Sequence, residues 1–462
     1  MSMRDDTHAA WLRALLGSGV LACVLFAGAP AALEAQRPDP LGELVAEALR
    51  TNLGLEGERL AERRADADVR EARGLFFPSL VLDSRYSHFD GVPNVGDLVN
   101  PAYTALNQLT GTNRFPTNID LTLPQRHESR VRFSQPLFNE GIRANYSLAR
   151  GRQDGQRMAR AAAARQLAAD VQIAYLQEAS ARRVAEIYDA TAALVQESQR
   201  VAERLLDAGR ATPEAVYRAR AERADVEQQL AEARERHLAA ARALNRILRR
   251  PLDAPVAVIP DSALALPLDI TPDSAVAHAL AVREELGQAA AGERTAVAAR
   301  RVATAAFLPS VAVAVDYGFQ SRDFAFRSEN DYWAASVVVS WNLFNGGRDA
   351  ARRAAAGYEV ERVRTLQRDL ADRIGLEVRT AYEAASVAQA AIATADARLE
   401  AARRTFALVR RRYDEGIASP IEFVDARTAY TSAELNRVLT AYRYAMRWVD
   451  LERAAALRTL AL

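Results

Sequence analysis

Residues 135–143 read QPLFNEGIR, and residues 341–349 read WNLFNGGRD. In both stretches a segment that alternates in polarity gives way to a long run of strong helix formers. Each stretch therefore predicts a turn from a strand into a helix. The shared Leu-Phe-Asn recurs at an offset of 206 residues, from Leu137 to Leu343. One turn present twice predicts that the chain contains two copies of the same unit.

Two further pairs of landmarks support a tandem duplication. Gly209 in DAGRATP and Gly416 in DEGIASP lie 207 residues apart, within one residue of the first offset. Pro78 in FFPS and Pro309 in FLPS lie 231 residues apart, so the first copy holds 25 additional residues between its landmarks. These residues fall within 89–125, a stretch rich in Gly, Pro, Asn and Thr that predicts a long loop.

The predicted organisation is a signal peptide over residues 1–35, followed by structural repeats over 36–270 and 271–462. Each repeat is expected to contain a helix, a β-hairpin, a long helix, a tight tip and a return helix, and a linker ends the first repeat. The expected positions are 89–125 for the long loop, 309–344 for the second hairpin, and 209–213 and 416–420 for the tips.

The first residues are typical of an export signal. Arg4 and Arg13 precede or flank an apolar run over 15–27, and small residues suited to cleavage follow. Cys23, the only cysteine, lies inside this run. Its surroundings faintly resemble a lipoprotein cleavage box, but the apolar run continues beyond it, which favours an ordinary residue of a removed signal. The mature chain then contains no thiol for a disulfide or a thiolate metal site.

Composition and motifs exclude several classes of function. All 60 basic residues are arginine, and 59 acidic residues nearly cancel them, so no nucleic-acid partner is expected. The chain has no glycine-rich phosphate loop and no His-Glu-x-x-His motif. The mature histidines are scattered over the expected loops and helices: His88, His127, His237 and His278. We therefore expect neither an enzyme nor a bound cofactor or metal.

Two very long helices are the main prediction for the remainder. Residues 142–208 and 349–415 are dominated by Ala, Arg, Glu, Leu and Gln and contain no proline. At about 1.5 Å per residue such a helix is roughly 100 Å long, which favours coiled-coil or bundle packing. Glycine ends each long helix, and Thr212-Pro213 or Ser419-Pro420 then predicts an N-cap hydroxyl before the first residue of a return helix.

Strands are expected between the leading and the long helix of each repeat. Residues 310–320, SVAVAVDYGFQ, and 333–342, WAASVVVSWN, alternate between an apolar face and a face of small or polar residues that includes Asp316. This pattern is typical of a membrane β-barrel, and equally of a soluble sheet with one buried face. Asp316 is expected to face a lumen. On the preceding hairpin, Arg130 and Arg132 are expected to face a lumen as well, or alternatively to bind headgroups at the membrane interface.

Four strands per chain cannot close on themselves in lipid, where open sheet edges are not tolerated. Eight strands already make a narrow, filled barrel. Three copies would supply twelve strands and a water-wide lumen, and the same trimer would assemble the helices into a tube. The predicted fold class is therefore mainly α with a β-barrel contribution, built by tandem duplication.

The chain resembles the TolC-type outer-membrane factor family over nearly its whole mature length. The resemblance is carried, in order and in duplicate, by ALRTNLGL and ALAVREEL, FFPSL and FLPSV, QPLFNEG and WNLFNGG, and DAGRATPEAV and YDEGIASPIEFVDA. It implies a homotrimer with a twelve-stranded barrel in outer-membrane lipid and a helical tunnel across the periplasm. The implied function is the exit duct of a tripartite efflux pump, whose partners are a periplasmic adaptor (membrane fusion protein) and an inner-membrane transporter.

The resemblance also implies site residues. Glu422 and Asp425 match acidic residues that line the periplasmic aperture of the tunnel, whereas Ala418 stands where a basic residue could lock them. Being three residues apart, the two carboxylates share one helix face. The implied contacts with the adaptor are the residues of the two tips: Gly209, Arg210, Pro213, Gly416, Ile417 and Pro420.

Two other functions stay open. The outer-membrane component of a type I protein secretion system has the same implied fold. A soluble periplasmic coiled-coil scaffold, whose strands form a small sheet, is a hypothesis of a different class.

Overall fold

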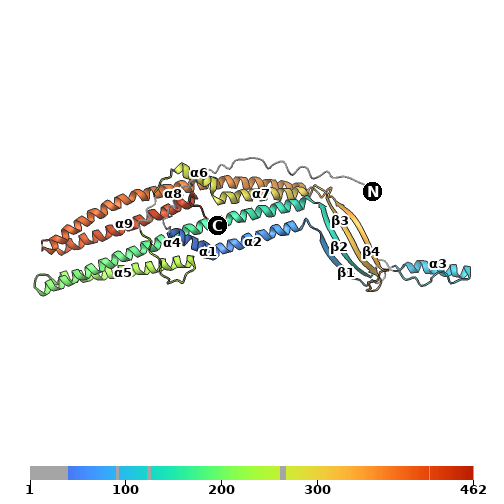
Figure 1. The fold of residues 1–462 in the computed structure, drawn as a ribbon, viewed down its shortest axis with the longest axis horizontal. Helices are drawn as coiled ribbons and strands as arrows, with labels where there is room; N and C mark the ends of the chain where they lie inside the picture. Colours follow the sequence, from blue (N-terminus) through green and yellow to red (C-terminus); the bar gives the residue numbers. More distant parts are fainter. Residues whose placement is uncertain (1–39, 90–92, 122–125, 261–266, 416, 461–462) are drawn as a thin grey trace, which may run out of the picture. The chain divides into compact units, whose positions relative to one another are not determined.

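The computed structural model describes residues 40–89, 93–121, 126–260, 267–415 and 417–460. The predicted signal peptide, with Cys23, lies outside the described residues, and so does Gly416 of the second tip. From Leu41 onward the described chain belongs to one compact unit, whose elements are labelled in Figure 1.

The helices repeat almost residue for residue. In the first repeat they are α1 (Pro40–Thr51), α2 (Leu53–Gly74), α4 (Glu140–Asp207) and α5 (Pro213–Leu248). In the second they are α6 (Pro272–Val282), α7 (Glu284–Ala305), α8 (Arg348–Asp414) and α9 (Pro420–Ala454). Equivalent helices have 12 and 11, 22 and 22, 68 and 67, and 36 and 35 residues. The predicted duplication is confirmed.

The prediction of a single leading helix is wrong in both repeats. At Asn52 and Arg283, which are 231 residues apart, the backbone is extended for one residue and the helix restarts. The Asn52 side chain caps α2 by accepting hydrogen bonds from the N–H groups of Gly54 and Leu55. Asparagine is a preferred N-cap because its side chain can satisfy the first free N–H groups.

Arg283 stabilises the second break through ion pairs instead of a cap. It is 7 % exposed and contacts Glu285 and Glu377 at 2.5 Å, and Arg453 of α9 also reaches Glu377. Burial raises the pKa of Glu377, but hydrogen bonds from Arg283 and Arg453 outweigh it and hold that pKa below its usual value. The break is therefore fixed by charges that come from three helices.

The prediction that residues 89–125 form only a loop is also wrong. Residues Val95–Thr110 form a helix, α3, that starts at the N-cap Asn94 and ends at Gly111 with φ +67°. The sequence pattern was dominated by turn formers, and Pro101 lies inside the helix. Asn100 holds the returning chain by two hydrogen bonds to the backbone of Ile119. Side-chain amides of asparagine therefore organise the insertion, where turn propensity predicted loop.

Four strands form one antiparallel sheet in the order β1-β2-β3-β4. They are β1 (Ser79–Tyr86), β2 (His127–Phe138), β3 (Ser310–Ser321) and β4 (Asp331–Ser340). The central pair joins the two repeats, with Arg132 opposite Asp316. The outer edges of β1 and β4 have no strand partner among the described residues.

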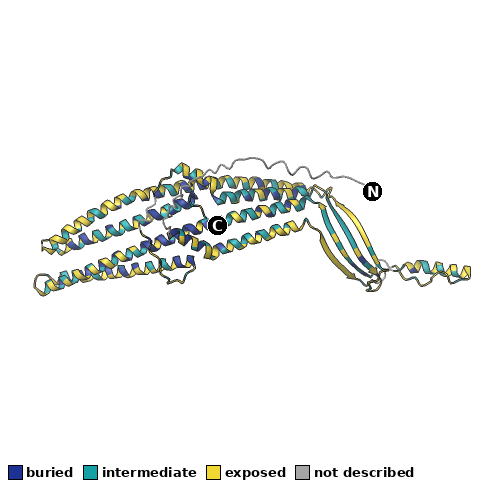
Figure 2. Ribbon diagram, in the orientation of Figure 1, coloured by how far each residue is buried: buried dark blue, intermediate teal, exposed yellow. Residues whose placement is uncertain are grey.

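The helices pack around α4 and α8. Helix α4 packs against α2, α5, α7 and α9, and helix α8 packs against α6, α7 and α9. Figure 2 shows that dark blue, buried positions gather in the helical part, whereas the sheet is coloured mainly as intermediate or exposed. The largest core cluster includes Tyr175, fully buried, whose hydroxyl accepts a hydrogen bond from the N–H of Ile259 in the linker.

In the described part of the chain, no helix is both long and apolar enough to cross a membrane.

The helix α4 lies close against α7 at Gly151. A Cβ added there would lie 2.5 Å from Thr295 Oγ1 and 3.2 Å from its backbone, whereas at Gly155 it would meet only Ala291 Cβ at 3.7 Å. We expect Gly151→Ala to push the helices apart and to lower the apparent melting temperature of the detergent-solubilised protein, at a cost of about 1–3 kcal/mol. Gly155→Ala should leave the apparent melting temperature unchanged or raise it, since alanine stabilises a helix by roughly 1 kcal/mol relative to glycine. Equal losses in both variants would contradict this assignment.

Candidate channel surface and periplasmic tips

One face of the sheet is apolar and uncovered. Every second side chain of each strand points to this face. The strand pairing brings Leu82 beside Val131, Val131 beside Tyr317, and Tyr317 beside Trp333. Leu82 is 71 % exposed and Trp333 74 % exposed. A soluble sheet buries its apolar face against other elements. The exposure therefore favours the membrane alternative that strand periodicity left open.

The opposite face carries paired charges. Arg132 and Asp316 form a two-point ion pair across β2 and β3, with Nε–Oδ1 at 2.7 Å and Nη2–Oδ2 at 2.8 Å. Arg130 contacts Asp83 of β1 at 3.6 Å and Glu128 at 3.4 Å. Arg130, Arg132 and Asp316 thus share the face that a lumen would require. Their orientation toward a lumen stays a prediction, because it depends on the closed barrel.

The first tip is a tight turn between α4 and α5. Gly209 has φ +73°, which glycine adopts without strain, and the N–H of Arg210 reaches back to the carbonyl of Leu205. Pro213 starts α5, but the Thr212 side chain makes no cap hydrogen bond, so the predicted hydroxyl cap is wrong there. Gly209, Arg210 and Pro213 are all exposed.

The second tip differs in its cap and its apolar surface. Ser419 does cap α9, accepting a hydrogen bond from the N–H of Glu422 at 3.3 Å, as predicted. Ile417 is 64 % exposed, and Pro420 is exposed as well. Behind this tip, stacked rings join α8 to α9: Tyr413 on Phe423 at 4.7 Å, and Phe406 on Tyr430 at 5.6 Å.

The two predicted aperture residues lie together in the first turns of α9. Glu422 and Asp425 are exposed, and no ion pair to either is found within the described residues. Ala418, at the position of the missing basic residue, is buried. Both carboxylates are therefore available to attract cations from the solution near the tip.

A basic residue missed by the sequence analysis lies one turn further along. Arg427 is 3 % exposed and forms an ion pair with Glu222 of α5, which links the return helices of the two repeats. Its Nε and Nη1 atoms have no hydrogen-bond partner among the residues that the structure describes. Burial lowers the pKa of Arg427 to about 10, so the side chain remains charged at neutral pH. No motif marked this residue, because its partner is 205 positions away.

A cleft of about 780 Å³ lies between the two tips. The long helices and the return helices of both repeats contribute to its walls, which include Arg210, Glu222, Ala418 and Phe423. The ion pair of Arg427 with Glu222 therefore bridges the two hairpins beside an open cleft.

Two repeated helical hairpins, joined to a sheet with one uncovered apolar face and one charged face, define a class of protein: an outer-membrane channel with a helical periplasmic part. Comparison with known families agrees. The profile of the family described as outer membrane efflux protein matches residues 44–248 and 275–457, one segment in each repeat. The chain belongs to this family, and the predicted resemblance and location in the outer membrane are confirmed.

Solved structures share the fold over most of the chain. A membrane protein from Pseudomonas aeruginosa is 20 % identical, with a TM-score of 0.75 over 91 % of this chain and 93 % of that one. The outer membrane channel CmeC of Campylobacter jejuni is 17 % identical, with a TM-score of 0.73 over 90 % and 85 %. Protein CyaE of Bordetella pertussis is 33 % identical over 138 residues, which span 29 % of this chain and only 28 % of CyaE.

Proposed function

We propose that three copies of this chain form a passive exit duct for small molecules, within a tripartite efflux pump. The observation that carries this proposal is the sheet, whose β1 and β4 edges have no strand partner in the part of the chain that the structure describes and whose apolar face is uncovered there. Four antiparallel strands place β4 of one copy antiparallel to β1 of the next, so the ring closes with a regular pattern. A measured mass of three chains in detergent would support the trimer, and a stable monomer would contradict it.

Assembly of the tunnel follows from the same geometry. Within a chain, contacts join α2 to α4, α4 to α7, and α7 to α8, so these helices lie in the order α2, α4, α7, α8. The far sides of α2 and α8 are then available to neighbouring copies, as the edges of the sheet are. The duct is proposed to continue from the barrel into a helical tube in the periplasm.

The tips are the proposed contact with a periplasmic adaptor, which would join the duct to an inner-membrane transporter. Exposed apolar side chains at both hairpin ends support this assignment, with Tyr217 at 68 %, Ile417 at 64 % and Ile421 at 50 % exposure. Exposed apolar groups that gather at one place on a surface often mark a protein interface.

The aperture is proposed to be cation-attracting. Threefold symmetry would bring three copies of Glu422 and Asp425 into one ring, with no compensating ion pair found for them in the described chain. A ring of carboxylates raises the local concentration of cations and repels anions.

Replacing Glu422 with glutamine and Asp425 with asparagine should lower the preference of the channel for cations over anions. The measurement is the reversal potential of purified protein in planar bilayers across a salt gradient. Glu214→Gln is the matched control, since Glu214 lies in the first turn of the other return helix and is already paired with Arg218 at 3.0 Å. An unchanged reversal potential in the double variant would reject the aperture assignment while leaving the duct itself intact.

A further inference from the structure

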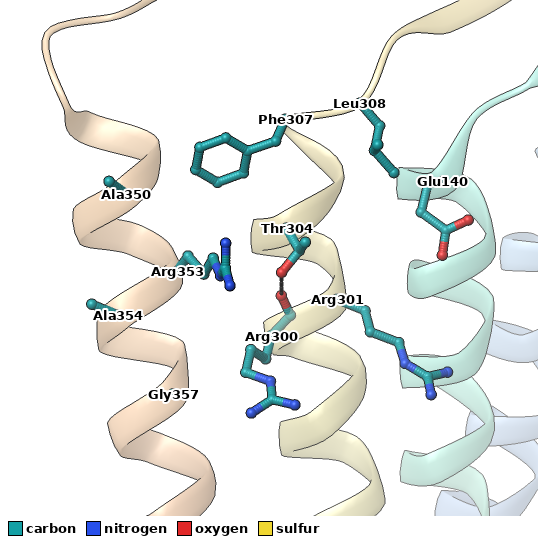
Figure 3. A pocket seen from close by; sticks show the side chains of 10 residues that line it. All are labelled: Glu140, Arg300, Arg301, Thr304, Phe307, Leu308, Ala350, Arg353, Ala354 and Gly357. Atoms are coloured by element: carbon teal, nitrogen blue, oxygen red, sulfur yellow. Dashed lines mark hydrogen bonds between the residues drawn. The ribbon is translucent and has the colours of Figure 1, made fainter.

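A groove of about 780 Å³ lies where the ends of α4, α7 and α8 meet the sheet. Figure 3 shows its side chains: Arg300 and Arg301 come from α7, Arg353 from α8, and Glu140 from the start of α4, with Phe307 and Leu308 at the upper end. The groove is separate from the tips and from the charged face of the sheet, and the proposed function does not use it.

The groove carries an excess of positive charge. Three arginines and one carboxylate line it. The carboxylate, Glu140, lies 4.0 Å from Arg143, and none of the three arginines forms an ion pair within the described residues. Some other exposed arginines of α7 and α8 do find carboxylates, as Arg364 does with Glu293 and Glu361. Arg353 instead lies over the ring of Phe307, with its Cζ atom 6.0 Å from the ring centre. The Arg353 side chain is therefore placed by packing against this ring, and no hydrogen bond from its N–H groups is found in the described chain.

The duplication provides an internal comparison. In both repeats a side chain near the junction of strand and long helix donates to the carbonyl of the equivalent phenylalanine, Trp341 to Phe307 and Gln135 to Phe76. The framework is therefore the same. In the first repeat, however, the partner of Phe76 is the ring of Tyr146, at 5.8 Å, where the second repeat has Arg353.

Arg300 is likewise without a charged counterpart. The equivalent position in the first repeat, 231 residues earlier, is Val69. Two of the three arginines thus belong to the second repeat alone. If these arginines served only to keep the helix surface soluble, the first repeat would need them as much as the second.

The groove lies at the level along the molecule where lipid headgroups are expected. The strands begin at Ser310, five residues after the end of α7, and Arg353 is the sixth residue of α8. At about 1.5 Å per helical residue, Arg300 and Arg353 lie roughly 8 Å from the helix ends that lead into the sheet. The headgroup layer on each side of a bilayer is about 5–7 Å thick, and a groove at these helix ends would lie next to it if the strands span the hydrocarbon core. Phe307 and Leu308 are 41 % and 43 % exposed, on the membrane side of the arginines.

We propose that this groove binds the phosphate of an anionic glycerophospholipid from the periplasmic leaflet of the outer membrane. Arginine suits this ligand because its planar fork of N–H groups matches phosphate oxygens at two points. Phe307 and Leu308 contact the glycerol and the first acyl carbons, and the apolar stems of the arginines extend the same surface. The proposal depends on the outer-membrane location of the sheet, and not on conduction through the duct.

The test is lipid retention by the purified full chain, measured by native mass spectrometry from mixed micelles of dioleoyl phosphatidylglycerol or dioleoyl phosphatidylcholine. The variant Arg300→Gln/Arg301→Gln/Arg353→Gln should bind phosphatidylglycerol at least about tenfold more weakly, since each substitution removes a charge-assisted hydrogen bond to the phosphate. Phosphatidylcholine retention should not change. Arg398→Gln is the matched control, because Arg398 is an exposed arginine of α8 far from the sheet.

Several outcomes would overturn the proposal. Equal retention of phosphatidylglycerol by wild type and triple variant would show that the groove does not hold it. Displacement of the lipid by excess inorganic phosphate would indicate a site for the free ion. A changed subunit number with unchanged lipid retention would indicate that a carboxylate of a neighbouring copy fills the groove. If the triple variant lacks the wild-type melting temperature, the single Arg353→Gln variant replaces it, with weaker retention of phosphatidylglycerol as the required result.

Discussion

Replacing Val337 with arginine is expected to keep the protein out of the outer membrane. Val337 lies on β4 opposite Val313 of β3, on the apolar face, and is 68 % exposed in the single chain. In the proposed trimeric barrel that face would meet lipid. An arginine on the lipid side near the middle of the bilayer costs about 2–4 kcal/mol, and every copy in the assembly carries the cost. The measurement is the fraction of the protein that co-sediments with outer membranes in a density gradient.

Ser336→Arg is the matched control for this prediction. Ser336 is adjacent in the chain but points to the other face, where it lies opposite Ala314. That face already accommodates the ion pair of Arg132 with Asp316. The Ser336 variant should therefore reach the outer membrane like the wild type. If both variants were inserted equally, the assignment of the two faces would be refuted.

Much of the fold could be predicted because the repeated landmarks are turns, and turns need particular residues. Gly209 allows a positive φ, Pro213 fits the first position of a helix, and Asn139 caps α4 through a hydrogen bond to Ile142 N–H. These requirements are local, so they leave a local trace. The spacing between them then gave the two long helices to within two residues of their observed ends.

Features fixed by distant contacts left no such trace. The break at Arg283 depends on Glu377, which lies 94 positions away on α8. The helix α3 depends on Asn100 reaching Ile119, which no turn propensity can indicate. At the tips, motif matching pointed to Ala418 as the place for a basic residue, whereas packing places Arg427 beside Glu222. Side-chain pairing between repeats is a property of the assembled helices.

Replacing Glu222 with glutamine is expected to open the periplasmic end of the channel. Arg427 is 3 % exposed, and its only ion pair in the described chain is with Glu222. Removing one partner of a buried pair leaves an uncompensated charge, at a cost of about 3–5 kcal/mol. The cost falls if α9 moves so that Arg427 reaches water, and α9 carries Glu422 and Asp425 in its first turns. We expect the ratio of open to closed channels to rise at least about tenfold, since 1.4 kcal/mol already suffices for that.

The measurement is the open fraction of single channels in planar bilayers, with two controls that separate charge from packing. The double variant Glu222→Leu/Arg427→Met removes both charges, and it should return to the wild-type open fraction because an apolar pair can replace a buried ion pair without loss of stability. Glu214→Gln removes an exposed carboxylate whose pair with Arg218 contributes at most about 1 kcal/mol, so it should change nothing. If the double variant opened as much as Glu222→Gln, the buried charge would not be what holds the two hairpins together, and the shape of the packed side chains would be responsible instead.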